Sequence, residues 1–199
     1  MTAPADAPQH WPVRASRDIW RGEAPFAVRQ DALEVPGTDE TFDRLVVEHP
    51  GAVVVLALDE SDRVLVLEQY RHPLGLRIVQ LPAGLLDQPG EDPVVAARRE
   101  LLEEGAVEAE RWRHLATTHT SPGICSERIE IYLAEGLREV PDRGGFDLEH
   151  EEADMSASWV SVDDLVSGVL DGRITDGPLQ VAVLALQALR VHPDGRADG

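Results

Sequence analysis

The sequence predicts a fold that mixes α-helices and β-strands, either α/β or α+β, without a regular strand–helix repeat. Residues 52–58 are nearly all aliphatic or β-branched, which is typical of a strand buried on both faces. Residues 93–105 carry apolar side chains at helical spacing between an Asp-Pro pair and a glycine, which indicates an α-helix. Because such patterns follow one another irregularly along the 199 residues, we expect a mixed sheet covered by helices.

The N-terminal part predicts a tail followed by strands. Residues 1–15 look like a loose tail, and a weak strand pattern centred on residues 26–29 is broken at Pro36-Gly37. A charged segment at 38–43 then separates this pattern from a second apolar stretch at 45–47. We therefore place a boundary after residue 45, with residues 1–45 as tail and strands and residues 46–195 as the main domain.

The main domain opens with its clearest strand, 52–58. A polar turn follows, and residues 63–69 are interpreted as the hairpin partner of that strand. Residues 77–81 predict a short strand that ends at Pro82. Residues 128–133 alternate between apolar and polar, and residues 155–160 predict a further strand after a long acidic loop at 135–154.

Helices are expected in three places. Asp92 is a good N-cap with proline after it, and this helix should stop near Gly105. Ser161 predicts the cap of a helix that reaches about residue 170. Asp176, followed by Gly-Pro, opens a last apolar helix over 179–191.

Charge and cysteine content exclude several classes of protein. The formal net charge is −19, and such an acidic surface repels nucleic acid and anionic membranes, whereas a small phosphorylated substrate could bind with a divalent cation. The single cysteine, Cys125, cannot form an intrachain disulfide, which favours a cytoplasmic location. No signal-peptide pattern occurs at the N-terminus, and no apolar run approaches the roughly 20 residues of a membrane span.

Three carboxylates lie on one face of the helix predicted at 93–105. Glu100, Glu103 and Glu104 are spaced i, i+3, i+4, so their side chains are neighbours and repel one another. A hard divalent cation such as Mg²⁺ would supply the missing positive charge, and Arg99 could hold a neighbouring carboxylate. Spacing alone, however, favours an ordinary solvated acidic face.

The flanking residues favour the functional interpretation. Residues 84–107, GLLDQPGEDPVVAARRELLEEGAV, resemble the Nudix box, G-x5-E-x7-R-E-U-x-E-E-x-G-U, where U is aliphatic. Two departures occur. First, six residues instead of five separate Gly84 from Glu91, and a loop absorbs such a change in length easily. Second, Ala106 stands where the family has glycine, and Gly105 lies one place earlier. The second departure bears on the C-cap of the helix. The residues that match are Gly84, Glu91, Arg99, Glu100, Leu101, Glu103, Glu104 and Val107.

Further segments, at 68–71, 81–84, 121–127 and 150–155, look like the ADP-ribose pyrophosphatase branch of the Nudix family, in its actinobacterial form. The resemblance implies an α/β/α sandwich around a mixed sheet, with an N-terminal strand extension. It also implies metal-dependent hydrolysis of ADP-ribose to AMP and ribose 5-phosphate, with Mg²⁺ as the cofactor and Mn²⁺ as the alternative. A homodimer that exchanges its N-terminal segments, residues 1–45, is implied as well.

The resemblance also assigns the site. Its metal ligands are Glu100, Glu103, Glu104 and the carbonyl of Ala83, with Gly84, Glu91 and Arg99 supporting them. Substrate contacts fall on Arg71, Arg44, Glu127 and Leu85, although Arg44 and Glu127 also fit ordinary surface charges. The helix carboxylates are occupied by metal, so the general base is expected on the acidic loop, at Glu151 in preference to Glu152.

Two alternatives stay open at this point. The first is a Nudix enzyme for another nucleoside diphosphate, such as a nucleotide sugar, a dinucleotide or an oxidised nucleotide. The second is a Nudix domain that binds a nucleotide without catalysis. Because all three helix carboxylates are present, the second is the weaker alternative.

Overall fold

The computed structural model describes residues 4–140 and 154–192. The chain divides into two compact units: Met1–His49 with Ser121–Ser126, and Pro50–Thr120 with Glu127–Gly199. The chain passes from the first unit to the second at His49, four residues after the predicted boundary. A short segment from the middle of the sequence also joins the first unit, which the sequence did not indicate.

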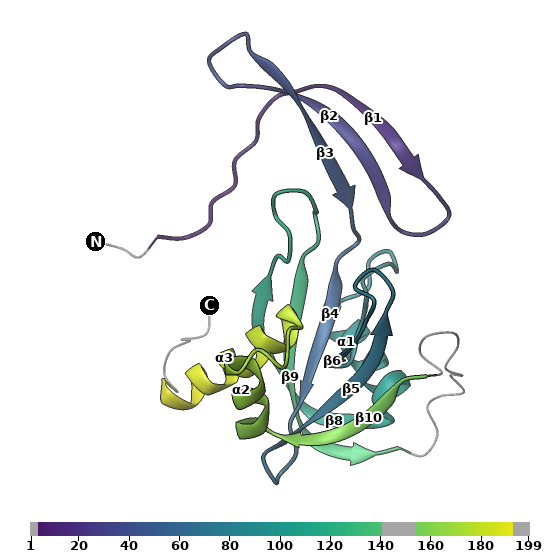
Figure 1. Cartoon of the computed structure of the whole chain (residues 1–199), viewed down its shortest axis with the longest axis vertical. Helices are drawn as coiled ribbons and strands as arrows, with labels where there is room; N and C mark the ends of the chain where they lie inside the picture. Colours follow the sequence, from purple (N-terminus) through teal and green to yellow (C-terminus); the bar gives the residue numbers. More distant parts are fainter. Residues whose placement is uncertain (1–3, 141–153, 193–199) are drawn as a thin grey trace. The chain divides into compact units, whose positions relative to one another are not determined.

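The first unit is a three-stranded antiparallel sheet in the order β1-β2-β3 (Figure 1). Its strands are β1 (Val13–Arg21), β2 (Ala27–Glu34) and β3 (Thr41–Glu48). The charged segment at 38–43 was expected to interrupt the strands, but β3 already begins at Thr41. Charged side chains are accommodated there because this part of the strand is exposed, and Asp43 accepts a hydrogen bond from Gln30 of β2.

The second unit contains two sheets. A mixed four-stranded sheet has the order β7-β4-β9-β8, in which β4 and β9 are parallel, and an antiparallel sheet has the order β10-β5-β6. The strands are β4 (Ala52–Ala57), β5 (Arg63–Arg71), β6 (Leu76–Gln80), β7 (Ala83–Leu85), β8 (Val107–Thr118), β9 (Ile129–Glu139) and β10 (Ser156–Ser161).

Helices cover both faces of the mixed sheet (Figure 1). Side chains alternate along β4, so Val53 and Val55 pack with α1 (Pro93–Gly105), whereas Val54 and Leu56 pack with α2 (Val162–Leu170) and α3 (Gly177–Val191). Burial of β4 on both faces explains its unbroken aliphatic sequence. The α/β/α sandwich around a mixed sheet is therefore confirmed.

Local capping determines where the helices begin, as predicted. The side chain of Asp92 accepts a hydrogen bond from Val94 N, that of Ser161 from Asp164 N, and that of Asp176 from Leu179 N. In the part of the chain that the structure describes, no helix is long and apolar enough to cross a membrane.

Strand pairing differs from the prediction at β5. Residues 63–69 were expected to form a hairpin with β4, yet both hydrogen-bonding edges of β4 are taken by β7 and β9. Only an isolated bridge, Leu58 to Val64, joins the ends of the two strands, and β5 pairs instead with β6 and β10.

The acidic loop also begins later than predicted. Residues 135–139 belong to β9 because they pair with the start of β8, a strand that the sequence analysis did not identify. Most side chains of β8 are exposed or half-buried, so it lacks the apolar alternation that marks a strand facing a core.

Candidate active site

Helix α1 carries two buried carboxylates toward the backbone of β7. Glu100 and Glu104 are each only 8% exposed, which is unusual for charged side chains. The amide of Ala83 donates a hydrogen bond to Glu104 Oε2 at 2.8 Å. A Cβ atom at Gly84 would lie 2.0 Å from the carboxyl carbon of Glu100, so only glycine leaves room for that side chain. The segment Ala83-Gly84 and the helix therefore fit together at two carboxylates.

Arg99 holds the adjacent glutamates. Its Nη1 donates to Glu100 Oε1 at 2.6 Å and to Glu103 Oε2 at 3.2 Å, and its Nη2 lies 3.6 Å from Glu91 Oε2. Burial opposes the charge of Arg99, but the nearby carboxylates of Glu100 and Glu103 raise the pKa of its guanidinium overall. Arg99 therefore stays charged and fixes three carboxylates around itself.

The loop before the helix absorbs the additional residue. Glu91 N donates to Gln88 O at 3.1 Å, which closes a turn, and Gly90 within this turn has φ +80°. Glu91 still reaches Arg99 despite the insertion. Among the described residues, Glu91 Oε2 and Arg99 Nε are buried without a hydrogen-bond partner. Glu91 Oε2 is still within ion-pair distance of Arg99 Nη2, so the additional loop residue leaves this contact of the box in place.

The helix ends at the substituted box position. Ala106 takes the left-handed conformation, φ 53° and ψ 37°, and its N–H donates to Leu102 O. The C-cap geometry that glycine usually supplies is thus made by alanine, against a steric penalty. Gly105 instead allows close packing between the end of α1 and β5, because a Cβ there would lie 2.7 Å from Leu65 Cδ2. The substitution therefore leaves Glu104 in its place on the helix.

The donor set on this face fits a hard divalent cation. Glu100, Glu103 and Glu104 bring negative charge that Arg99 alone does not balance, and carboxylate oxygens are the ligands that Mg²⁺ prefers. In the arrangement described, these side chains turn to Arg99 and to the Ala83 amide. Within residues 4–140 and 154–192, no group of three or more His, Cys, Asp or Glu side chains is arranged to hold a metal ion.

Arg71, predicted to bind substrate, lies at the end of β5 and is half-buried. Its Nε donates to Gln80 Oε1 at 2.6 Å, and Gln80 Nε2 donates to Asp176 Oδ1 at 2.8 Å. Gln80 ends β6, three residues before Ala83, so Arg71 is tied to the segment that contacts the helix carboxylates. The sequence analysis identified Asp176 only as a helix cap and did not identify Gln80.

Other predicted contacts are distributed between the two units. In the second unit, Leu85 ends β7, and Glu127 accepts a hydrogen bond from Thr120 Oγ1. In the first unit, Arg44 is exposed on β3 with its guanidinium 4.9 Å from the centre of the Phe42 ring. Cys125 belongs to the first unit and is half-buried.

The predicted base cannot be located. Glu151 and Glu152 lie outside the described residues. The second described range begins at Asp154, whose carboxylate accepts a hydrogen bond from Arg77 Nη1 at 2.6 Å just before β10. Glu151 therefore stays a prediction of the family resemblance.

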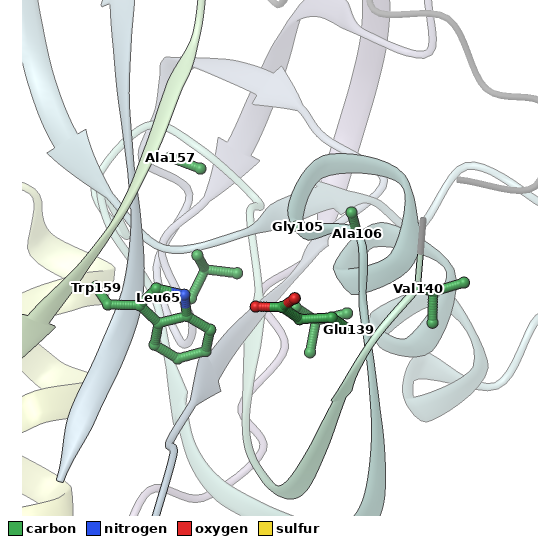
Figure 2. Close-up of a pocket in the computed structure, with 8 residues that line it drawn as sticks. Leu65, Gly105, Ala106, Glu139, Val140, Ala157 and Trp159 are labelled. Carbon is green, nitrogen blue, oxygen red and sulfur yellow. The ribbon is translucent and has the colours of Figure 1, made fainter. Parts of the chain in front are cut away.

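A cavity of about 460 Å³ lies at the C-terminal end of α1. Figure 2 shows the indole of Trp159 and the carboxylate of Glu139 pointing into the same space from β10 and β9, with Gly105 and Ala106 at the helix end. The residues that line it include none of the predicted metal ligands or substrate contacts. Gly105, Ala106 and Val107 are the residues that this cavity shares with the box.

Comparison with known families identifies the family to which the chain belongs. The NUDIX domain model matches residues 48–179, which include the whole of α1 and β7. This chain belongs to the Nudix family. The resemblance to the Nudix family that the box indicated is thereby confirmed.

Relatives of this Nudix protein support a narrower grouping. It is 42% identical over 166 residues to the ADP-ribose pyrophosphatase of Mycobacterium tuberculosis, covering 83% of this chain and 78% of the relative. It is 33% identical to the ADP-ribose pyrophosphatase of Bacillus subtilis, over 87% of this chain and 90% of the relative. It is also 40% identical to the methanol dehydrogenase activator of Bacillus methanolicus, over 79% and 82%.

A solved structure described as an ADP compounds hydrolase shares the fold. The TM-score is 0.73, covering 97% of this chain and all of that one, at 21% sequence identity. Because the identity is low, this likeness supports the fold alone.

Proposed function

We propose that this Nudix protein hydrolyses the pyrophosphate bond of ADP-ribose, with a divalent cation, to AMP and ribose 5-phosphate. The observation that carries the proposal is the buried pair Glu100 and Glu104 set against the Ala83-Gly84 backbone, with Arg99 beside them. Two relatives named ADP-ribose pyrophosphatase, at 42% and 33% identity, support this substrate.

Glu100, Glu103, Glu104 and the carbonyl of Ala83 would hold the cation, Mg²⁺ or alternatively Mn²⁺. When bound, the cation supplies positive charge to the phosphate oxygens and lowers the pKa of a bound water. Arg99 fixes the direction of the carboxylates, since it bonds to two of them at once. Water adds to one phosphorus atom, and the bond from that phosphorus to the bridging oxygen breaks, so that the oxygen leaves with the other product.

Arg71 is the chain's proposed contact to the substrate's phosphates, because a guanidinium forms paired hydrogen bonds to phosphate oxygens. Arg44, Glu127 and Leu85 are proposed as further substrate contacts. Glu151 is proposed to accept the proton of the attacking water, with Glu152 as the alternative.

A substrate panel tests the function. Purified protein is incubated with ADP-ribose and Mg²⁺ or Mn²⁺, and AMP is resolved by chromatography. A kcat/KM for ADP-ribose well above that for nucleotide sugars, dinucleotides and oxidised nucleotides supports the proposal. Preference for another diphosphate overturns the substrate, and no turnover on any diphosphate overturns the activity.

One relative favours a second candidate, activation of a dehydrogenase. The methanol dehydrogenase activator of Bacillus methanolicus is nearly as similar as the first pyrophosphatase, 40% against 42% identity. Adding this protein to purified methanol dehydrogenase and following the rate of methanol oxidation tests the candidate directly. An unchanged dehydrogenase rate, together with ADP-ribose turnover, excludes it.

A homodimer with exchanged N-terminal segments is proposed for the first unit. All nine residues of β1 are exposed, and the exposed set includes Val13, Ile19 and Trp20, at 53%, 48% and 52%. Apolar side chains on an exposed strand need a partner to avoid non-specific association. Light scattering at micromolar concentration should give twice the 21.8 kDa chain mass, and a fully active monomer contradicts the exchange.

A cytoplasmic location also stays a prediction, which cell fractionation tests.

A further inference from the structure

A polar chain of three residues runs from the start of α3 to Arg71. Asp176 Oδ1 accepts from Gln80 Nε2 at 2.8 Å, and Gln80 Oε1 accepts from Arg71 Nε at 2.6 Å. Asp176 is buried at 9% exposure, whereas Gln80 and Arg71 are half-buried. The two ends of the chain come from segments 105 positions apart in the sequence, so only the fold brings them together.

The direction of these hydrogen bonds is fixed by chemistry. Arginine can only donate, and an ionised carboxylate can only accept, so a group between them must accept on one side and donate on the other. The amide of Gln80 does both in one planar group. Glutamate at this position would lack the donor, and an aliphatic residue would lack both. Gln80 is therefore a relay between a buried carboxylate and a guanidinium.

Asp176 is a rigid anchor for this relay. Its second oxygen, Oδ2, accepts from Leu179 N at 2.9 Å and caps α3, whose Leu179, Ala182 and Val183 are fully buried. Burial raises the pKa of Asp176 overall, and the hydrogen bonds from Leu179 and Gln80 and the charge of Arg71 oppose this rise only in part. Both oxygens of this buried side chain accept a hydrogen bond, which offsets the cost of burying them.

The relay leaves one side of Arg71 available. Among the described residues, the structure gives its guanidinium this one hydrogen bond, made through Nε. The two terminal nitrogens form the edge of the guanidinium that pairs with phosphate oxygens. The hydrogen bond at Nε restricts rotation of the guanidinium, so Arg71 loses less conformational entropy when the substrate binds.

We propose that Asp176, acting through Gln80, is a positioning residue that fixes Arg71 for binding the substrate's phosphates. This inference rests on the proposed function of Arg71 as a phosphate contact. Asp176 itself does not touch the substrate.

An amide swap tests the relay without removing the helix cap. Asp176→Asn keeps one oxygen for Leu179 N, and asparagine caps helices as well as aspartate does. Its NH₂ group then faces residue 80. Gln80 must turn its oxygen toward Asn and its own NH₂ toward Arg71 Nε, which places two donors face to face. We expect the KM for ADP-ribose to rise about tenfold, from the loss of one charge-assisted hydrogen bond, with kcat nearly unchanged.

The double variant Asp176→Asn with Gln80→Glu should restore binding. A carboxylate at position 80 accepts from the asparagine NH₂ on one side and from Arg71 Nε on the other, and the total charge equals that of the wild type. We expect KM to return to within about threefold of wild type. Gln80→Glu alone should bind poorly, because two acceptors then face each other. In an Arg71→Ala background, Asp176→Asn should have no further effect on KM.

Two outcomes overturn the inference. The first is an unchanged KM in Asp176→Asn. The second is a raised KM that the double variant does not correct although its melting temperature equals that of the wild type. If Asp176→Asn unfolds, Gln80→Met, which leaves the cap intact, must show the same rise in KM. Wild-type protein without turnover refutes the proposed function instead. In that case the Kd of ADP-ribose, measured by calorimetry without added metal, decides the relay across the same variants.

Discussion

The close contact between Gly84 of β7 and Glu100 of α1 gives a sharp prediction for this site. In Gly84→Ala, the new Cβ would lie 2.0 Å from the carboxyl carbon and Oε1 of Glu100. Ordinary contact begins at 3.4 Å, so the carboxylate must move by about 1.4 Å to reach it. The side chain of Glu100 is flexible, so the fold should survive, but a proposed metal ligand is displaced. A misplacement of about 1 Å costs on the order of 100-fold in rate.

The assay compares kcat for ADP-ribose hydrolysis across a Mg²⁺ titration with the melting temperature of each variant. Gly84→Ala should lose about 100-fold in kcat while its melting temperature falls by no more than about 4 °C. Gly177→Ala is the matched control, because no atom lies within 4 Å of a Cβ built there, and it should retain activity. A Gly84→Ala variant with kcat within about twofold of wild type would refute the reasoning, since Glu100 would then tolerate displacement.

Three further predictions concern single residues. Glu104→Gln should keep the fold and the contact with the Ala83 amide but lower kcat by several orders of magnitude, and near wild-type turnover in saturating Mg²⁺ would exclude Glu104 as a ligand. Ala106→Gly should raise the free energy of unfolding by about 0.5–1 kcal/mol in urea titrations, because relief of left-handed strain, about 1–2 kcal/mol, exceeds the added chain entropy; a loss of stability would contradict this. Glu151→Gln should lower kcat by about 10²–10⁴-fold with KM preserved, and Glu152→Gln should be milder; steady-state kinetics showing the reverse ranking would make Glu152 the base.

Local signals explain which parts of the fold were predictable. Helix α1 was identified at both ends because Asp92 caps it, Pro93 starts it and the apolar spacing continues to Gly105. Strand β4 was equally clear, since burial on both faces leaves an aliphatic run. These signals lie within one segment of the sequence and need no knowledge of distant residues.

Pairing over long distances explains what was missed. The sequence could not show that β9, and not β5, would pair with β4, because the two parallel partners begin 77 residues apart. Strand β8 carries charged side chains on its exposed positions and therefore resembles a loop. The relay through Gln80 was invisible for the same reason as the pairing: glutamine and aspartate are ordinary surface residues until the fold buries them.

Strand β3 depends on residues that are synthesised much later. Val47 donates its N–H to Ile124 O at 2.8 Å and accepts from Ser126 N at 3.0 Å. On the ribosome, the first unit therefore stays incomplete until nearly eighty further residues have emerged, including all of α1. For protein engineers, a chimera that exchanges residues 1–49 alone would leave the end of this strand without its own partner. An exchange of the first unit should carry the 121–126 segment with it.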